Sequence, residues 1–106
     1  MILNLGGGVL VREQDVVGIF DLEITSQSHR TRQYLREAEQ RGHVRYVDIN
    51  EIPKSFVVCA PPGEGQTVIL SPLSPQTLQR RLENEIGSPF KIIGNANSYL
   101  QRRNSL

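Results

Sequence analysis

Hydrophobic positions change their spacing several times along the chain, and each spacing predicts a different element. The first 23 residues contain two runs of branched apolar residues, 2–11 and 16–22, which are typical of strands. Gly6, Gly7 and Gly8 interrupt the first run. No helix pattern and no Lys-Ser/Thr pair follows them, as a phosphate-binding loop would require. We therefore expect a bulge or a tight bend at these glycines.

The spacing becomes helical at residues 28–41 and again at 75–86, where apolar residues recur every three or four positions. The shared faces are Thr31, Tyr34, Leu35 and Ala38 in the first helix and Leu78, Leu82 and Ile86 in the second. Ser26 or Ser28 is placed to cap the first helix, and Gly42 to end it. Ser74 followed by Pro75 is the preferred start for the second helix.

Three further strands are predicted between the two helices. Residues 44–49 alternate between apolar and polar, while 54–60 and 67–70 flank a loop rich in proline and glycine and suggest an antiparallel hairpin. The pattern predicts an α+β fold, with a small, mostly antiparallel sheet and two helices, over residues 1–87. Residues 88–106 read as a C-terminal tail, partly mobile or docked on a neighbouring molecule.

Length and composition limit the choice of class. A chain of 106 residues with 38% apolar residues is long enough for one core, and a domain this small gains stability by assembling into an oligomer. The net charge of +1 demands neither nucleic acid nor a membrane. The single Cys59 lies in an apolar run, and no signal peptide or membrane-spanning stretch is visible. We expect a soluble cytoplasmic protein.

Residues suited to catalysis are scarce. His29 and His43 have no cysteine or carboxylate at the spacing of metal ligands, so we expect no metal site. The sequence contains no nucleophile elbow, no Cys–His signature and no phosphate loop. We therefore predict that the protein is not an enzyme, and we infer neither a cofactor nor a small-molecule substrate.

Arginines on the outer face of the first helix are the strongest physical indication of function. They are Arg30, Arg32, Arg36 and Arg41. Guanidinium groups bind phosphate bidentately, so this face is a candidate for nucleic-acid binding, which Lys54 and the terminal Arg102 and Arg103 would widen. The alternative is a solubilising surface, because Glu37 and Glu39 partly neutralise it.

Three ordered segments carry a resemblance to a known family. They are Asn4–Val11 leading into Asp15–Asp21, then Pro53–Val58, and then Val68–Leu78 followed by Arg80 and Arg81. Together they resemble the extracellular matrix regulatory proteins of Bacillus-type bacteria, RemA and RemB, and the B-type in particular. The match extends from about residue 1 to residue 83, and each segment alone is weakly specific.

The resemblance implies a small α/β domain similar in shape to LytTR-type DNA-binding modules, and it implies ring-like homo-oligomers. For the A-type it also implies a DNA-binding activator of matrix genes. This sequence departs from the A-type pattern at two places. Asp15 replaces an arginine before a strand, and Ile52-Pro53 replaces an adjacent pair of arginines. The A-type DNA contacts therefore do not carry over.

Two functions remain open after this comparison of patterns. The first is a ring-forming, DNA-associated transcriptional regulator of matrix or biofilm genes, in which Arg30, Arg32, Arg36 and Lys54 contact the phosphates of double-stranded DNA. The second is an oligomeric scaffold that binds proteins and does not bind DNA, which the loss of cations at Asp15 and Pro53 favours.

Overall fold

The computed structural model describes residues 2–25 and 27–86, and within them it has an α+β fold. The predicted tail over 88–106, with Arg102 and Arg103, lies outside these residues. The elements in chain order are β1 (Ile2–Asn4), β2 (Leu10–Arg12), a 3-10 turn (Glu13–Asp15), β3 (Val16–Asp21), α1 (Leu22–Thr25), α2 (His29–Gln40), β4 (Val44–Tyr46), β5 (Ser55–Cys59), β6 (Thr67–Ser71) and α3 (Pro75–Ile86).

Four strands form the central sheet in the order β3-β5-β6-β4. The predicted hairpin is confirmed, because β5 and β6 pair antiparallel and β3 pairs antiparallel with β5. β4 joins the far edge parallel to β6. It ends at Tyr46, earlier than predicted, because Asp48 begins a turn in which its carboxylate accepts a hydrogen bond from the backbone N–H of Asn50 at 2.9 Å. Ile49 therefore lies in a loop and not in a strand.

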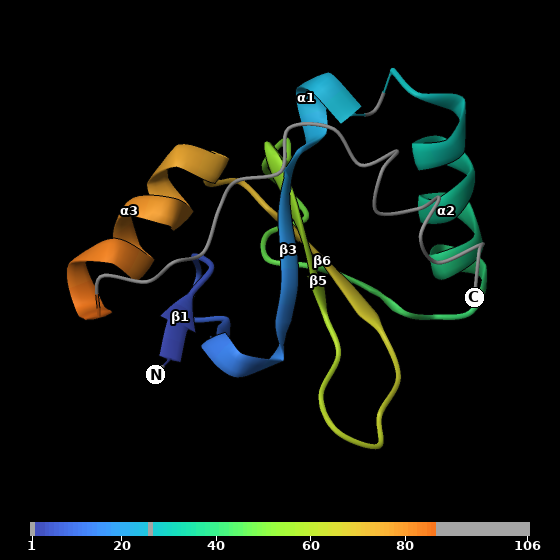
Figure 1. Ribbon diagram of the computed structural model, residues 1–106. Helices are drawn as coiled ribbons and strands as arrows, with labels where there is room; N and C mark the ends of the chain where they lie inside the picture. Colours follow the sequence, from blue (N-terminus) through green and yellow to red (C-terminus); the bar gives the residue numbers. More distant parts are fainter. Residues whose placement is uncertain (1, 26, 87–106) are drawn as a thin grey trace.

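The sheet is covered on both faces, so the alternating side chains of its central strands are all buried. On one face, Val57 and Cys59 of β5 pack with α3 and the β1–β2 hairpin. On the other, Phe56 and Val58 pack beneath α2, and the Phe56 ring stacks on Phe20 with centroids 4.7 Å apart. Figure 1 shows α3 and α2 on opposite sides of the strands.

A tight turn at the three glycines folds β1 back onto β2, which confirms the predicted bend. All three glycines have positive φ angles, of 104°, 56° and 79°, which other residues adopt only with strain. At Gly7 a Cβ atom would lie 3.1 Å from Val47 Cγ1. The turn therefore needs glycine both for its backbone conformation and for its close approach to the segment after β4.

Two buried serines attach the surrounding loops to the end of the sheet. Ser55 and Ser71 are paired in register between β5 and β6. The Ser71 hydroxyl donates to the carbonyl of Leu5 at 2.7 Å and accepts from the N–H of Leu73 at 3.1 Å. The Ser55 hydroxyl donates to the carbonyl of Leu73 at 2.6 Å. These bonds fix the β1–β2 hairpin and the approach to α3 against the sheet.

Side-chain caps define where the helices begin. The Ser28 hydroxyl accepts from the N–H of Thr31, and the Ser74 hydroxyl accepts from the N–H of Thr77, so both predicted helix starts are confirmed. The short helix α1 was not expected, because residues 16–22 were assigned to one strand. The carboxylate of Asp21 accepts from the N–H groups of Glu23 and Ile24 at 2.9 and 3.3 Å, which ends β3 and starts α1.

Candidate nucleic-acid interface

The buried face of α2 sets which way its arginines point. Thr31 is fully buried, and the side chains of Tyr34, Leu35 and Ala38 pack against the cluster around Phe56. This face is the one the sequence predicted. Because it fixes the rotation of the helix on the sheet, the remaining positions of α2 face outward or lie at the two flanks.

The four predicted contact residues do not form one continuous group. Arg32 and Arg36 are exposed and one turn apart, so they lie on the same flank of α2. Arg32 also donates to the backbone carbonyl of Gln27 at 3.2 Å. Arg30 is half-buried and, at 3.6 residues per turn, it lies about 160° around the helix from Arg32. The structure therefore brings two of the helix arginines together and separates the third.

Lys54 is exposed at the end of the sheet where α2 begins. Its N–H donates to the carbonyl of Ser71 at the end of β6, and its carbonyl accepts from the N–H of Leu22 at the start of α1. α2 follows α1 in the chain, so its N-terminal end lies near α1. Its C-terminal end lies near the start of β6, because the Val68 N–H donates to the His43 carbonyl. Lys54 and the cationic start of α2 thus share one end of the molecule.

Charges along α2 are arranged against the helix dipole. Its first turn contains no acidic residue and its last turn no basic one. Arg30 and Arg32 lie near the N-terminus, while Glu37 and Glu39 lie near the C-terminus. A helix carries partial positive charge at its N-terminus and partial negative charge at its C-terminus. The charges and the dipole therefore add, at some cost in helix stability, and concentrate positive potential at the end nearer Lys54.

The other cations of this region do not extend the Arg32–Arg36 flank. Arg45 pairs in parallel register with Ile69, whose side chain packs on the α3 face of the sheet, so Arg45 lies on the face opposite α2. Arg41 follows the last turn of α2 and lines a hollow at that end of the helix. These two positions leave Arg32, Arg36 and Lys54 as the best placed of the candidate phosphate contacts.

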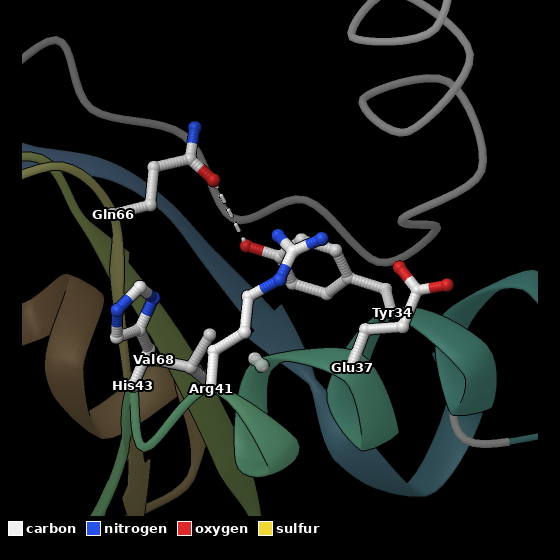
Figure 2. Close-up of a pocket in the computed structure, with 7 residues that line it drawn as sticks. Tyr34, Glu37, Arg41, His43, Gln66 and Val68 are labelled. Atoms are coloured by element: carbon white, nitrogen blue, oxygen red, sulfur yellow. Dashed lines mark hydrogen bonds between the residues drawn. The ribbon is translucent and has the colours of Figure 1, made fainter.

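A hollow beside the C-terminal end of α2 was not anticipated from the sequence. Figure 2 shows its walls, which come from α2, from the segment before β4 and from the start of β6. The Tyr34 hydroxyl and the Gln66 side-chain oxygen lie 3.1 Å apart in a hydrogen bond across it. These two residues are 32 positions apart, so no local motif could have indicated the site.

Several large apolar side chains are exposed, and four of them lie in pairs on two segments. Ile49 and Ile52, in the loop between β4 and β5, are 82% and 87% exposed. Ile2 and Leu10, on the β1–β2 hairpin, are 49% and 60% exposed. We call the first group the isoleucine loop and the second the hairpin surface. The isoleucine loop includes Ile52, one of the positions at which the A-type pattern has arginine.

The described residues, 2–25 and 27–86, were compared with the features that metal sites, reactive thiols and membrane spans require. Within those ranges no three His, Cys, Asp or Glu side chains converge as metal ligands would, and no helix is long and apolar enough to cross a membrane. Cys59 is buried and free, and burial, with a smaller contribution from the charge of Asp15, raises the pKa of its thiol to about 11. A thiol in that state is a poor nucleophile.

Comparison with known proteins gives two matches. A model of RemA-like proteins, described as extracellular matrix regulatory protein A-like, matches residues 2–82. The extracellular matrix regulatory protein B of Bacillus subtilis (strain 168) is 32% identical over 83 residues, which cover 78% of this chain and 91% of that protein. The family match extends over the sheet, over α2 and over α3 as far as Leu82.

Proposed function

Because this chain belongs to the RemA-like family of extracellular matrix regulatory proteins and is similar to its B-type member, we propose that it is a cytoplasmic regulator that acts by binding DNA as a homo-oligomer. The contacts are made to phosphates by Arg32 and Arg36 of α2 and by Lys54. Arg30 lies on the other flank and contributes less. Its role in the cell is the control of transcription of matrix genes.

The reversed charge pattern of α2 is the observation that carries this proposal. Helices normally have acids near the N-terminus and bases near the C-terminus, because each such charge stabilises the helix by about 0.3–1 kcal/mol. α2 has the opposite arrangement at both ends. A solubilising surface does not require this loss of stability, whereas an anion-binding surface gains from it, since the dipole and the guanidinium groups attract phosphate together.

Self-association is supported by the two exposed apolar groups. The isoleucine loop and the hairpin surface differ in sequence and lie on different segments. When two unlike surfaces of identical chains bind each other, the contact repeats from copy to copy and closes into a ring if the rotation allows. A ring would present many copies of the Arg32–Arg36 flank, so modest phosphate contacts would add up to useful avidity.

DNA binding is tested by fluorescence anisotropy with a labelled duplex. Three phosphate contacts for each bound subunit predict that affinity falls about 40-fold between 50 and 200 mM salt, because each contact releases condensed counterions. Arg32→Glu with Arg36→Glu should weaken binding at 50 mM salt by at least about tenfold. Lys54→Glu should weaken it by a smaller factor.

The matched control reverses the same number of charges on the other side of the sheet. Arg45→Glu with Arg80→Glu changes two exposed arginines on β4 and on α3. This variant should retain at least about half of the wild-type affinity after correction for net charge. Equal losses in the two double variants, or no retention of DNA by the wild-type oligomer at 50 mM salt, would rule out the α2 surface.

The ring is tested by mixing two defective variants. Ile49→Ser with Ile52→Ser removes the isoleucine loop, and Leu10→Ser with Ile2→Ser removes the hairpin surface. Light scattering should show that each variant alone is monomeric. An equimolar mixture should form dimers, because one variant retains the surface that the other lacks. Wild-type protein that is monomeric at micromolar concentration would contradict the ring, and a mixture that stays monomeric would contradict these two surfaces.

A scaffold that binds proteins instead of DNA is the second candidate. The observation in its favour is the isoleucine loop, which presents two strongly exposed apolar side chains, one of them, Ile52, at a position where the A-type pattern has a cation. This function predicts an oligomer whose elution is unchanged by a DNA fragment at low salt. The Arg32→Glu, Arg36→Glu variant would then behave as wild type in every binding assay.

A further inference from the structure

We propose that the hollow beside the C-terminal end of α2 is a binding site for a carboxylate group carried on a small apolar molecule. It occupies about 180 Å³. Its residues come from three separate elements, so folding assembles it: Tyr34, Glu37, Ala38, Arg41, His43, Gln66 and Val68. This proposal is independent of DNA binding, because the hollow lies at the end of α2 opposite Lys54.

The floor of the hollow is apolar and its rim is polar. Val68 is buried in β6, and Ala38 and the Tyr34 ring are half-buried on the inner side of α2. Figure 2 shows Arg41, His43 and Gln66 around the opening, with Glu37 on the far side of Tyr34 from Gln66. Such a site suits a ligand with an apolar body and one polar group, which is the usual composition of a small-molecule pocket.

The hydrogen-bond donors at the rim suit an oxyanion. Arg41 offers a guanidinium group, whose paired N–H groups match the two oxygens of a carboxylate. The Gln66 side chain is held through its oxygen by the 3.1 Å bond to the Tyr34 hydroxyl, and in Figure 2 its amide nitrogen points away from that bond. The imidazole of His43 faces Arg41 across the opening. Arg41 and His43 therefore place two different donor groups at the opening, and Gln66 closes one wall through its bond to Tyr34.

The end of α2 is closed in a way that reduces an expected repulsion. Carbonyl oxygens at a helix C-terminus ordinarily point outward and repel anions. Here the N–H groups of Arg41, Gly42 and His43 donate to the carbonyls of Glu37, Glu39 and Ala38 at 3.1, 3.0 and 2.9 Å. Gly42 permits this with a φ angle of 74°. The carbonyls of Glu37, Ala38 and Glu39 are thus already bonded, and the positive charge of Arg41 offsets the negative potential that remains at this end of the helix.

Size and charge narrow the class of ligand. A volume of about 180 Å³ corresponds to roughly six water molecules, which is below the range of about 300–1,000 Å³ typical of sites for nucleotides and drug-sized molecules. The negative charge of Glu37 lies on the same rim as the positive charge of Arg41. Glu37 therefore disfavours a ligand that carries two negative charges. A short monocarboxylate therefore fits better than a phosphate.

Calorimetry with sodium isobutyrate at constant ionic strength is the direct test. We expect millimolar binding, at least tenfold weaker binding of the uncharged isobutyramide, and weaker binding of inorganic phosphate. Arg41→Gln should reduce isobutyrate affinity at least tenfold. Tyr34→Phe, which releases Gln66, should reduce it several-fold. The matched control is Arg45→Gln, which removes an exposed arginine on the other face of the sheet and should change affinity less than twofold.

Contrary outcomes are equally specific. Equal binding of acid and amide, tighter binding of phosphate, or an unchanged affinity in a folded Arg41→Gln protein would each overturn the carboxylate site. Circular dichroism of each variant establishes that it is folded. A blocked peptide with one aspartate, compared with its asparagine counterpart, identifies the source: binding comparable to isobutyrate assigns a protein side chain, and weaker binding assigns a free metabolite.

Discussion

Two hydroxyl side chains, Thr31 and Ser71, are completely buried but differ in their hydrogen bonds. The Ser71 hydroxyl bridges the backbone of Leu5 and Leu73. The Thr31 hydroxyl has no hydrogen-bond partner within the described part of the chain, although the Thr31 N–H is capped by Ser28. A buried hydroxyl without a partner costs free energy, because it loses its bonds to water.

Thr31→Val should therefore raise the free energy of unfolding by about 1 kcal/mol, since it keeps the shape of the side chain and removes the unpaired oxygen. Ser71→Ala is the comparison at equal burial, and it should lower the free energy of unfolding by about 1–3 kcal/mol because it leaves the Leu5 carbonyl unpaired. Urea denaturation measures the free energy of unfolding of both variants. A loss of stability in Thr31→Val would mean that its hydroxyl is paired in solution.

Cys59 gives a pH dependence at the same scale. Burial raises its thiol pKa in the folded protein from 9.0 to about 11. The unfolded chain loses this proton at a lower pH than the folded protein does, so the stabilisation is complete below pH 9 and is lost as the pH rises towards 11. We expect wild type to lose up to about 3 kcal/mol more than Cys59→Val over this interval, because the valine has no proton to lose. An equal loss of stability in wild type and Cys59→Val between pH 9 and pH 11 would contradict this.

The position of helix α2 could be predicted from the sequence, although its charges are arranged unfavourably for the helix dipole. Its apolar face and its Ser28 cap were recognisable because both depend on residues within one or two turns. The strand pattern over 16–22 includes Leu22, the first residue of α1, and the sequence therefore does not predict this short helix. β4 begins where predicted and ends early at the local turn of Asp48, whereas its parallel pairing with β6 depends on contacts with distant residues. Local signals therefore predicted the helices better than they predicted the arrangement of strands.

Glu39→Lys should stabilise α2, because it replaces an acid in the last turn with a base that interacts favourably with the helix dipole. We expect the free energy of unfolding to rise by about 0.5 kcal/mol at low salt and by less at 1 M salt, where the charge is screened. Glu64→Lys makes the same charge change in an exposed loop between β5 and β6 and should leave stability nearly unchanged. Similar gains in both variants would point to net charge and not to the dipole.

At the scale of the molecule, one small sheet supports three different surfaces. The Arg32–Arg36 flank, the isoleucine loop and the hollow were predictable to different degrees. The arginines were visible as a cluster in the sequence, but only the structure separates Arg30 from them. The hollow joins Tyr34 to Gln66 across the fold, and the exposure of Ile49 depends on where β4 ends.

Self-association through the isoleucine loop predicts that thermal stability depends on protein concentration, because binding between folded copies stabilises them by mass action. The midpoint of unfolding for wild type should rise by several degrees between 1 and 100 µM. Ile49→Ser with Ile52→Ser should abolish this dependence and leave the midpoint close to the wild-type value at 1 µM. Scanning calorimetry at both concentrations decides this. A wild-type midpoint that is constant over the range would contradict the proposed oligomer.

The bond from Ser71 to the Leu5 carbonyl joins residues 66 positions apart and so constrains how the chain folds as it is synthesised. Leu3 and Leu5 are buried in a cluster with side chains of β5, β6 and α3, which are translated much later. At about 5–20 residues per second, the ribosome needs roughly 3–13 s to make the intervening segment. During that time the N-terminal strand can pair with β2 but lacks its contacts with β5, β6 and α3. A nascent chain stopped before β6 should therefore remain sensitive to proteases and bind chaperones, even though its first hairpin is complete.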